Sequence, residues 1–174
     1  MPSGPKPPPN SPPTSHISKA GASTPLPPCN PHTWVLQPPE KSYTADQKKD
    51  RLRKAGDVGS VAEADAADHN KVKSGDDMSG ANKASKLNQV CSVCRAQGGD
   101  VDHVNRDDSG KITEVVEVKG GKCNVDKAQI LRRKELADAM GAKVRVKLKG
   151  PGAALAQKAI AESPDLAGIL VTVL

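Results

Sequence analysis

The sequence predicts a mixed α/β domain, with a small mixed central sheet flanked by helices and a disordered proline-rich arm in front of it. Aliphatic residues are concentrated after Asn88, where β-branched runs typical of strands alternate with two runs of helical periodicity. Every proline except Pro151 and Pro164 falls within residues 1–39, where polyproline or coil is favoured over a packed core. A compact C-terminal half is thus expected to follow an extended N-terminal one.

We therefore expect three parts along the 174 residues. Residues 1–43 form a disordered proline-rich segment. Residues 44–87 form a polar, partly helical linker, because they are rich in Ala, Asp, Lys and Ser and hold few large apolar groups to bury. Residues 88–174 form the compact domain, a length that folds alone with modest stability.

The linker contains two predicted helices. Thr44 is a good N-cap residue and Gly56 is typical of a helix end, so a short helix is expected between them. A weaker helix is expected over residues 60–68. In the compact domain we expect strands at 88–94, 100–104 and 112–119, a helix at 126–140, a strand at 142–148, a helix at 153–162 and a strand at 168–174.

The most informative run is the β-branched strand 112–119, in which Glu117 and Lys119 are two residues apart. Side chains alternate along a strand, so these two share one face. A turn over residues 105–111 folds the segment that carries Asp102 back beside this strand, with Asp100 as a rival acid. Two acids and a lysine on paired strands are suited to hold Mg²⁺ or Mn²⁺, activate a water and steady a phosphate.

The helix at 126–140 has two polar residues within its apolar sector, Gln129 and Arg133. One interpretation places Arg133 at the rim, with its stem on apolar surface and its head in water. The other places both residues over the carboxylate face, where they reach the site or a phosphate. The apolar residues of this sector are Ile130, Leu136, Ala137 and Met140.

Positive charge is concentrated just after the acidic residues. Residues 122–149 hold nine lysines and arginines against three acids, an excess equal to the net charge of +6 of the whole chain. Such a stretch suits a polyanion, or else it merely solvates a helix and an edge strand. We expect Lys122, Lys127, Arg132 and Arg133 to contact nucleic acid. The chain has one Trp, one Tyr and no Phe, so stacking platforms for single strands are not expected.

An acid on one strand, a hydrophobic strand ending in Glu117-Val118-Lys119, a helix and another strand together resemble the PD-(D/E)xK, or restriction-endonuclease-like, nuclease superfamily. The match covers about residues 88–149, and no proline precedes Asp102 as the pattern would have it. The resemblance implies Mg²⁺-dependent phosphodiester hydrolysis, DNA being the more expected substrate than RNA. It implies that Asp102 and Glu117 ligate the metal, that Lys119 is the site lysine, and that Gln129 supports it.

The chain looks most like the nuclease domains at the C-termini of bacterial polymorphic toxins. That resemblance implies an antibacterial effector that reaches the cytoplasm of a target cell, and a dedicated immunity protein as partner. No apolar run approaches the about 18 residues of a membrane span, and the N-terminus lacks the charged region followed by an apolar region that is typical of a secretory signal. Delivery by a route without a signal peptide is therefore expected.

Two alternatives remain. Cys91-Ser-Val-Cys94 followed by His103 is similar to the first half of an HNH nuclease, but no histidine and no second Cys-x-x-Cys follows His103. A structural zinc site would need Cys123 or His103 as further ligands, and we favour cysteines that pack as small apolar residues. The second alternative is a non-enzymatic basic module that binds nucleic acid and carries a proline-rich interaction arm.

Overall fold

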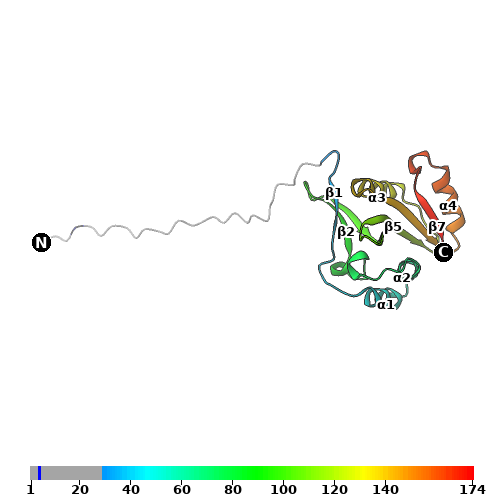
Figure 1. Cartoon of the computed structure of the whole chain (residues 1–174), viewed down its shortest axis with the longest axis horizontal. Helices are drawn as coiled ribbons and strands as arrows, with labels where there is room; N and C mark the ends of the chain where they lie inside the picture. The colour runs from blue at the N-terminus through cyan, green and yellow to red at the C-terminus, as the bar shows by residue number, and fades with distance from the viewer. Residues whose placement is uncertain (1–3, 5–28) are drawn as a thin grey trace.

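The computed structural model describes residue 4 and residues 29–174, and in it two β-sheets lie between two pairs of helices (Figure 1). The first sheet is antiparallel and has the order β1 (Trp34–Gln37), β2 (Leu87–Cys91), β3 (Gln97–Val101). The predicted mixed α/β class is confirmed. The disorder predicted for residues 1–43 falls mostly on 1–3 and 5–28, which lie outside the described residues.

The second sheet is mixed and has the order β4 (His103–Arg106), β5 (Ile112–Gly120), β6 (Lys143–Lys149), β7 (Leu170–Val173). β4 runs antiparallel to β5, whereas β5, β6 and β7 run parallel to one another. We predicted one strand over residues 100–104, and the structure divides it at Asp102 between the two sheets. That division is why there are two sheets where one was expected.

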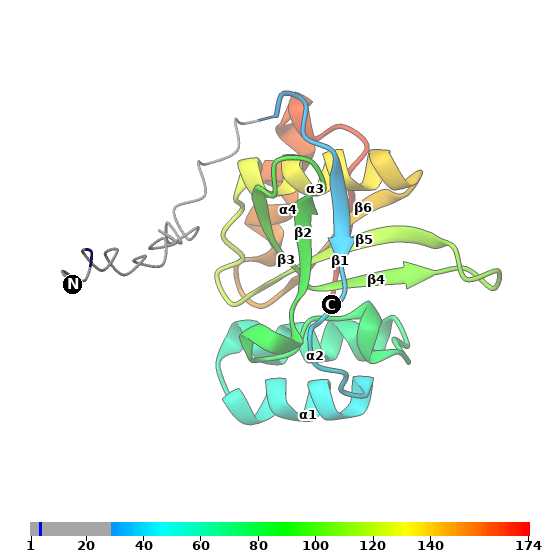
Figure 2. The same cartoon turned by 90° about the vertical axis from the view of Figure 1, so that its left-hand side faces the viewer.

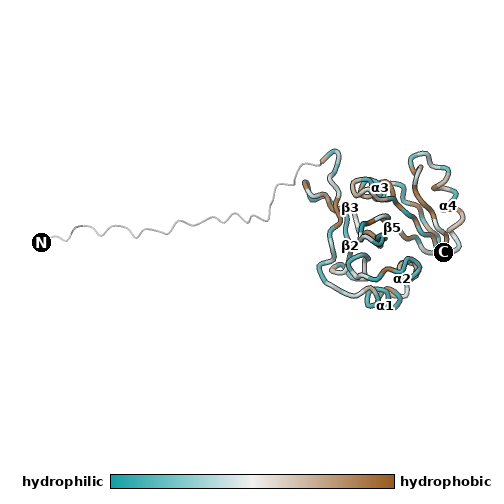
Figure 3. The backbone as a smooth tube through the Cα atoms, viewed as in Figure 1, coloured by the Kyte–Doolittle hydropathy of each residue, from teal (hydrophilic) through white to brown (hydrophobic). Residues whose placement is uncertain are grey.

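Helices cover both faces of the mixed sheet (Figure 2). On one side lie α1 (Ala45–Ala55) and α2 (Val58–His69), and α2 packs on β5. On the other side lie α3 (Lys127–Met140) and α4 (Ala153–Glu162), packed on β5, β6 and β7. Hydrophobic residues are found mainly along the strands next to α3 and α4 (Figure 3).

Alternation along β5 decides which side chains meet which helix. Val116 and Val118 are buried against Ala62 and Ala66 of α2. Val115 belongs to the main core, together with residues of α3 and β6, so Glu117 and Lys119 also lie on the α3 side. The predicted shared face of Glu117 and Lys119 therefore lies under α3.

Residues 44–87 are part of the folded unit and not a linker, which corrects our expectation. The predicted first helix is confirmed, with a capping box between Thr44 and Gln47 and a left-handed Gly56 at its end. We judged that these residues could bury little surface alone. The apolar surface of α2 is buried against β5, because the side chains on both sides of the contact are small. Two alanines of α2 face β5, and Gly120 leaves room for the helix: a Cβ on Gly120 would lie 2.7 Å from the backbone oxygen of Val58.

The last residues of the predicted arm are also structured. β1 pairs with β2, and the indole Nε1 of buried Trp34 donates a hydrogen bond to Glu135 Oε2 of α3 at 2.6 Å. Among the described residues, no helix has the length and apolar character needed to cross a bilayer.

Candidate functional site

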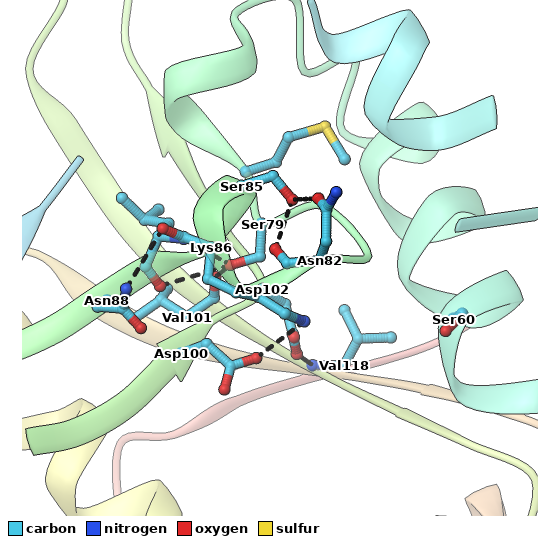
Figure 4. Close-up of polar contacts among 12 residues, drawn as sticks. Ser60, Ser79, Asn82, Ser85, Lys86, Asn88, Asp100, Val101, Asp102 and Val118 are labelled. Atoms are coloured by element: carbon cyan, nitrogen blue, oxygen red, sulfur yellow. Dashed lines mark hydrogen bonds and ion pairs between the residues drawn. The ribbon is translucent and has the colours of Figure 1, made fainter. Parts of the chain in front are cut away.

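The two sheets meet at Asp102, the residue between β3 and β4. Asp102 is 8% exposed, and its Oδ2 accepts a hydrogen bond from the backbone amide of Val118 at 2.6 Å (Figure 4). In the β4–β5 ladder His103 is opposite Val116, so this amide lies just beyond the last paired residues. The Asp102 side chain thus accepts a hydrogen bond from the β5 backbone at the point where the backbone pairing of β4 with β5 ends.

Ser79 holds the backbone at this joint. Its amide donates to the Asp102 carbonyl at 2.9 Å, and its hydroxyl donates to the Val101 carbonyl at 2.6 Å (Figure 4). The same hydroxyl oxygen accepts a hydrogen bond from the Leu87 amide at 2.9 Å. Ser79 therefore fixes the position of the backbone from which the Asp102 side chain extends.

Glu117 is buried on β5 and is held by two cations. Its Oε1 accepts from Lys119 Nζ at 3.1 Å, and its Oε2 accepts from Arg133 Nε at 3.1 Å. Lys119 Nζ also donates to Gln129 Oε1 of α3 at 2.6 Å. The structure thus brings together Glu117, Lys119 and Gln129, as the sequence analysis expected.

Arg133 is completely buried: it reaches the site carboxylate Glu117, as one interpretation expected, but it does so inside the protein. Besides Glu117, its guanidinium donates to Gln89 Oε1 at 2.6 Å, to the Gly98 carbonyl at 2.9 Å and to the Asp100 carbonyl. It does not lie at the rim, and its donors are directed at protein acceptors. Arg133 therefore positions Glu117, and we no longer assign it a contact with a nucleic-acid phosphate.

Glu63 of α2 is an acid of this site that the sequence analysis missed. Its Oε2 is buried and has no hydrogen-bond partner among the described residues. Burial raises the pKa of Glu63 to about 7; Lys86 opposes this shift, and the charges of Asp100 and Glu117 add to it. No sequence motif includes Glu63. The only signal in the sequence is that Glu63 directly follows Ala62, one of the alanines through which α2 packs on β5.

The acids repel one another at this joint. Burial raises the pKa of Asp102 well above its usual value, and the charges of Glu117 and Glu63 add to the effect. Asp100 differs from these acids: its carboxylate is half exposed and pairs with Lys86 Nζ at 3.3 Å (Figure 4). Of the two rival acids, Asp102 is the one enclosed with Glu63 and Glu117.

A positive charge at this joint would favour the ionised form of the acids. Two buried carboxyl groups with raised pKa values, one of them with an unpartnered oxygen, gain from a positive charge that lets them ionise. Carboxylate oxygens are the ligands that Mg²⁺ prefers. The charges of Glu63, Asp102 and Glu117 thus interact at this joint, and the Lys119 ammonium pairs with Glu117.

The remaining basic residues predicted to contact nucleic acid lie at or near the surface. Lys122 is exposed, and Arg132 is half-buried on α3. Lys127 is half exposed and forms an ion pair with Asp165. His103, the general base of the HNH-like alternative, is buried against Asn70, and burial lowers its pKa to about 3. That position denies it contact with a substrate.

A second cluster consists of Cys29, His32, Cys91 and Cys94, and it is suitable for a metal such as zinc. The ligand atoms of these residues all lie within 4.8 Å of one another. We had considered Cys123 and His103 as partners of the Cys91–Cys94 pair. Cys123 instead donates from Sγ to the Lys119 carbonyl at 3.2 Å. The missed signal was a Cys29-x-x-His32 pair with the same spacing as Cys91-x-x-Cys94.

Comparisons with protein-family models, with curated proteins and with solved structures find no match to this chain.

Proposed function

We propose that this protein is a metal-dependent nuclease that hydrolyses phosphodiester bonds, DNA being the favoured substrate. The observation that carries the proposal is the enclosure of Glu63, Asp102 and Glu117 at one joint of the fold, with Lys119 Nζ 3.1 Å from Glu117 Oε1. Buried like charges cost stability unless a cation compensates them. Mg²⁺ or Mn²⁺ is a cation of the right chemistry for an all-oxygen site.

In the proposed reaction a water oxygen attacks the phosphorus and gives up a proton to solvent, and the bond from phosphorus to the leaving oxygen breaks as that oxygen takes up a proton from solvent. Asp102, Glu117 and Glu63 would hold the divalent cation. When bound, it would polarise a phosphate oxygen and offset the charge that develops on the leaving group. Hydrogen bonds to Glu117 and Gln129 hold the Lys119 ammonium in place. Its proposed role is to orient the water or to stabilise negative charge on the phosphate.

The surroundings of the site are consistent with a polyanionic substrate. Arg133 neutralises Glu117 from inside the protein, so Arg132 and Lys122 near the surface remain as candidates to neutralise phosphates. The mixed sheet with helices on both faces also agrees with the restriction-endonuclease-like fold that the sequence resembles. This likeness rests on the order and packing of β5, α3 and β6.

We further propose that the nuclease acts as an antibacterial toxin effector in the cytoplasm of a target cell. What supports this role is the sequence resemblance alone. Such an enzyme would harm the cell that makes it, so we propose a dedicated immunity protein as its partner. An acidic surface on that partner would associate rapidly with a basic substrate-binding face.

The test is cleavage of supercoiled plasmid by the purified chain. We expect nicking with Mg²⁺ or Mn²⁺ and none with EDTA. Asp102→Asn should be inactive, while Glu162→Gln, on the exposed end of α4, should cleave like the unmodified protein. Retardation of plasmid without cleavage under all metal conditions would instead select the non-enzymatic binding module.

A further inference from the structure

We propose that Cys29, His32, Cys91 and Cys94 bind one structural zinc ion, which clamps the chain at residues 29–32 onto the hairpin of β2 and β3. The proposal does not depend on the nuclease function. It rests on four soft donors from two distant parts of the sequence that the fold brings to one point.

The geometry of the cluster is close to that of a tetrahedral zinc site. Bonds of about 2.3 Å to sulfur and about 2.0–2.1 Å to nitrogen place tetrahedral ligand atoms about 3.6–3.8 Å apart. The Cys94 Sγ to His32 Nδ1 distance is 3.3 Å, and no pair of ligand atoms exceeds 4.8 Å. Side-chain movements of about 1 Å would complete the coordination.

The donor set selects the metal and its role. Three thiol groups and one imidazole suit Zn²⁺, whereas Mg²⁺ and Ca²⁺ prefer oxygen ligands. Four protein ligands leave no open position for water, which is the mark of a structural site and not of a catalytic one. All four cysteines of the chain are free thiols, so no disulfide competes for these sulfurs.

The backbone around the ligands is built to present them. Cys91 ends β2, and Cys94 lies in the turn before β3, where Arg95 adopts a positive φ of 60° and its amide donates to the Cys91 carbonyl at 2.9 Å. Within the same turn, the Ser92 amide donates to the carbonyl of Thr33, the residue that follows His32, at 2.9 Å. The two ligand pairs are thus fixed by main-chain contacts as well as by the proposed metal.

The His32 ring is oriented by its neighbour Trp34. The two ring centroids are 4.5 Å apart, and Trp34 is anchored through its indole Nε1 to Glu135 of α3. β1 has four residues and pairs with β2 alone, so its own hydrogen bonds hold it weakly. A metal that joins His32 to Cys94, 62 residues apart, would restrain this edge strand by closing a long loop.

The experiment measures metal in the full, untagged chain purified under reducing conditions. We expect about one zinc per chain by elemental analysis, and a tetrahedral thiolate spectrum after replacement by Co²⁺. Cys29→Ser and Cys94→Ser should lose the metal. Cys123→Ser is the matched control and should keep it, because Cys123 contacts the Lys119 carbonyl and not the cluster.

His32 provides a variant that separates metal loss from misfolding. His32→Ala should bind zinc at least about tenfold more weakly, and His32→Cys should restore one zinc per chain with a cobalt spectrum shifted toward four thiolates. Wild-type protein with no zinc and no tetrahedral Co²⁺ spectrum would overturn the proposal. So would a Cys29–Cys94 disulfide found by mass spectrometry. A failure of plasmid cleavage with zinc present would overturn the proposed function alone.

Discussion

Arg133 Nε donates to Glu117 Oε2 at 3.1 Å inside the protein, and this pair ties α3 to the strand that carries the candidate site. Three further acceptors, from Gln89, Gly98 and Asp100, also bind the guanidinium. The first sheet therefore supports the mixed sheet through one side chain. A buried cation with four of its five N–H donors used on protein acceptors is a positioning group, and its removal should lower stability before it weakens binding.

Arg133→Ala should lower the free energy of unfolding by about 3–5 kcal/mol, because it leaves Glu117 buried with one partner fewer. Urea denaturation measures this loss. The matched control is Arg132→Ala, on the half-buried neighbouring residue. Arg132→Ala should leave stability nearly unchanged and flatten the salt dependence of DNA binding, because one phosphate fewer is neutralised. The reverse pattern would show that Arg133 contacts the nucleic acid.

Lys119→Ala should abolish or reduce plasmid cleavage by about 10²–10³-fold, because it removes the ammonium group next to the acids. The Lys119 side chain is partly exposed and Arg133 still pairs with Glu117, so the variant should fold, with a smaller loss of stability than Arg133→Ala. Glu117→Gln should also be inactive, but it is the less clean test because it strands the buried Arg133 charge. Full activity in the Lys119 variant, measured at saturating Mg²⁺, would remove this lysine from the site.

Glu63→Gln should change how stability depends on pH in the absence of divalent metal. The pKa of Glu63 is raised to about 7, above its ordinary value of 4.5, so the folded state holds the proton more tightly than the unfolded one. Its contribution is present at pH 4 and is lost as the pH rises toward 7, by up to about 3 kcal/mol. Urea denaturation from pH 4 to pH 8 in EDTA should show a shallower decline for the variant. Parallel profiles would mean that Glu63 titrates normally.

Addition of Mg²⁺ at pH 8 should raise the Tm of the unmodified protein, because a ligand that binds only the folded state stabilises it. At about 100 times the Kd this amounts to about 2.7 kcal/mol. The shift should vanish in Asp102→Asn and persist in Asp100→Asn, whose carboxylate is half exposed and pairs with Lys86. An equal loss in both variants would show that the two acids share the cation.

Gly120→Ala should detach α2 from β5, since the new Cβ would lie 2.7 Å from the Val58 carbonyl oxygen and 3.0 Å from the Ala62 Cβ. We expect a loss of about 1–3 kcal/mol from this overpacking. Hydrogen exchange would report faster exchange over α1 and α2 while α3 stays protected. Unchanged exchange would mean that the helix can shift to accommodate a methyl group.

Local pattern was enough to predict much of the fold. The strand with Glu117 and Lys119, the helix that follows it and the capped helix after Thr44 all depend on short-range periodicity and end signals. The division of residues 100–104 between two sheets was not predictable in this way. It depends on a hydrogen bond between the Asp102 side chain and Val118, which are 16 residues apart.

The same limit explains the errors at the candidate sites. The sequence left Arg133 either at the rim or over the carboxylate face, yet the residue is completely buried and its acceptors come from β2, β3 and β5. Cys29 and His32 join Cys91 and Cys94 only through the pairing of β1 with β2. Glu63 enters the site only because α2 packs on β5. Each of these contacts is long-range, so no local window of the sequence contains it.

The single-residue joint at Asp102 makes the chain unequally tolerant of changes in length. One residue added between Val101 and His103 would invert the alternation of β4 relative to β3, and core side chains of one sheet would then face water. The turn at Asp107–Lys111 is exposed and closes with its own hydrogen bonds, so it can accept insertions without disturbing either sheet. A tag or reporter therefore belongs in that turn, whereas the spacing through Asp102 must be kept.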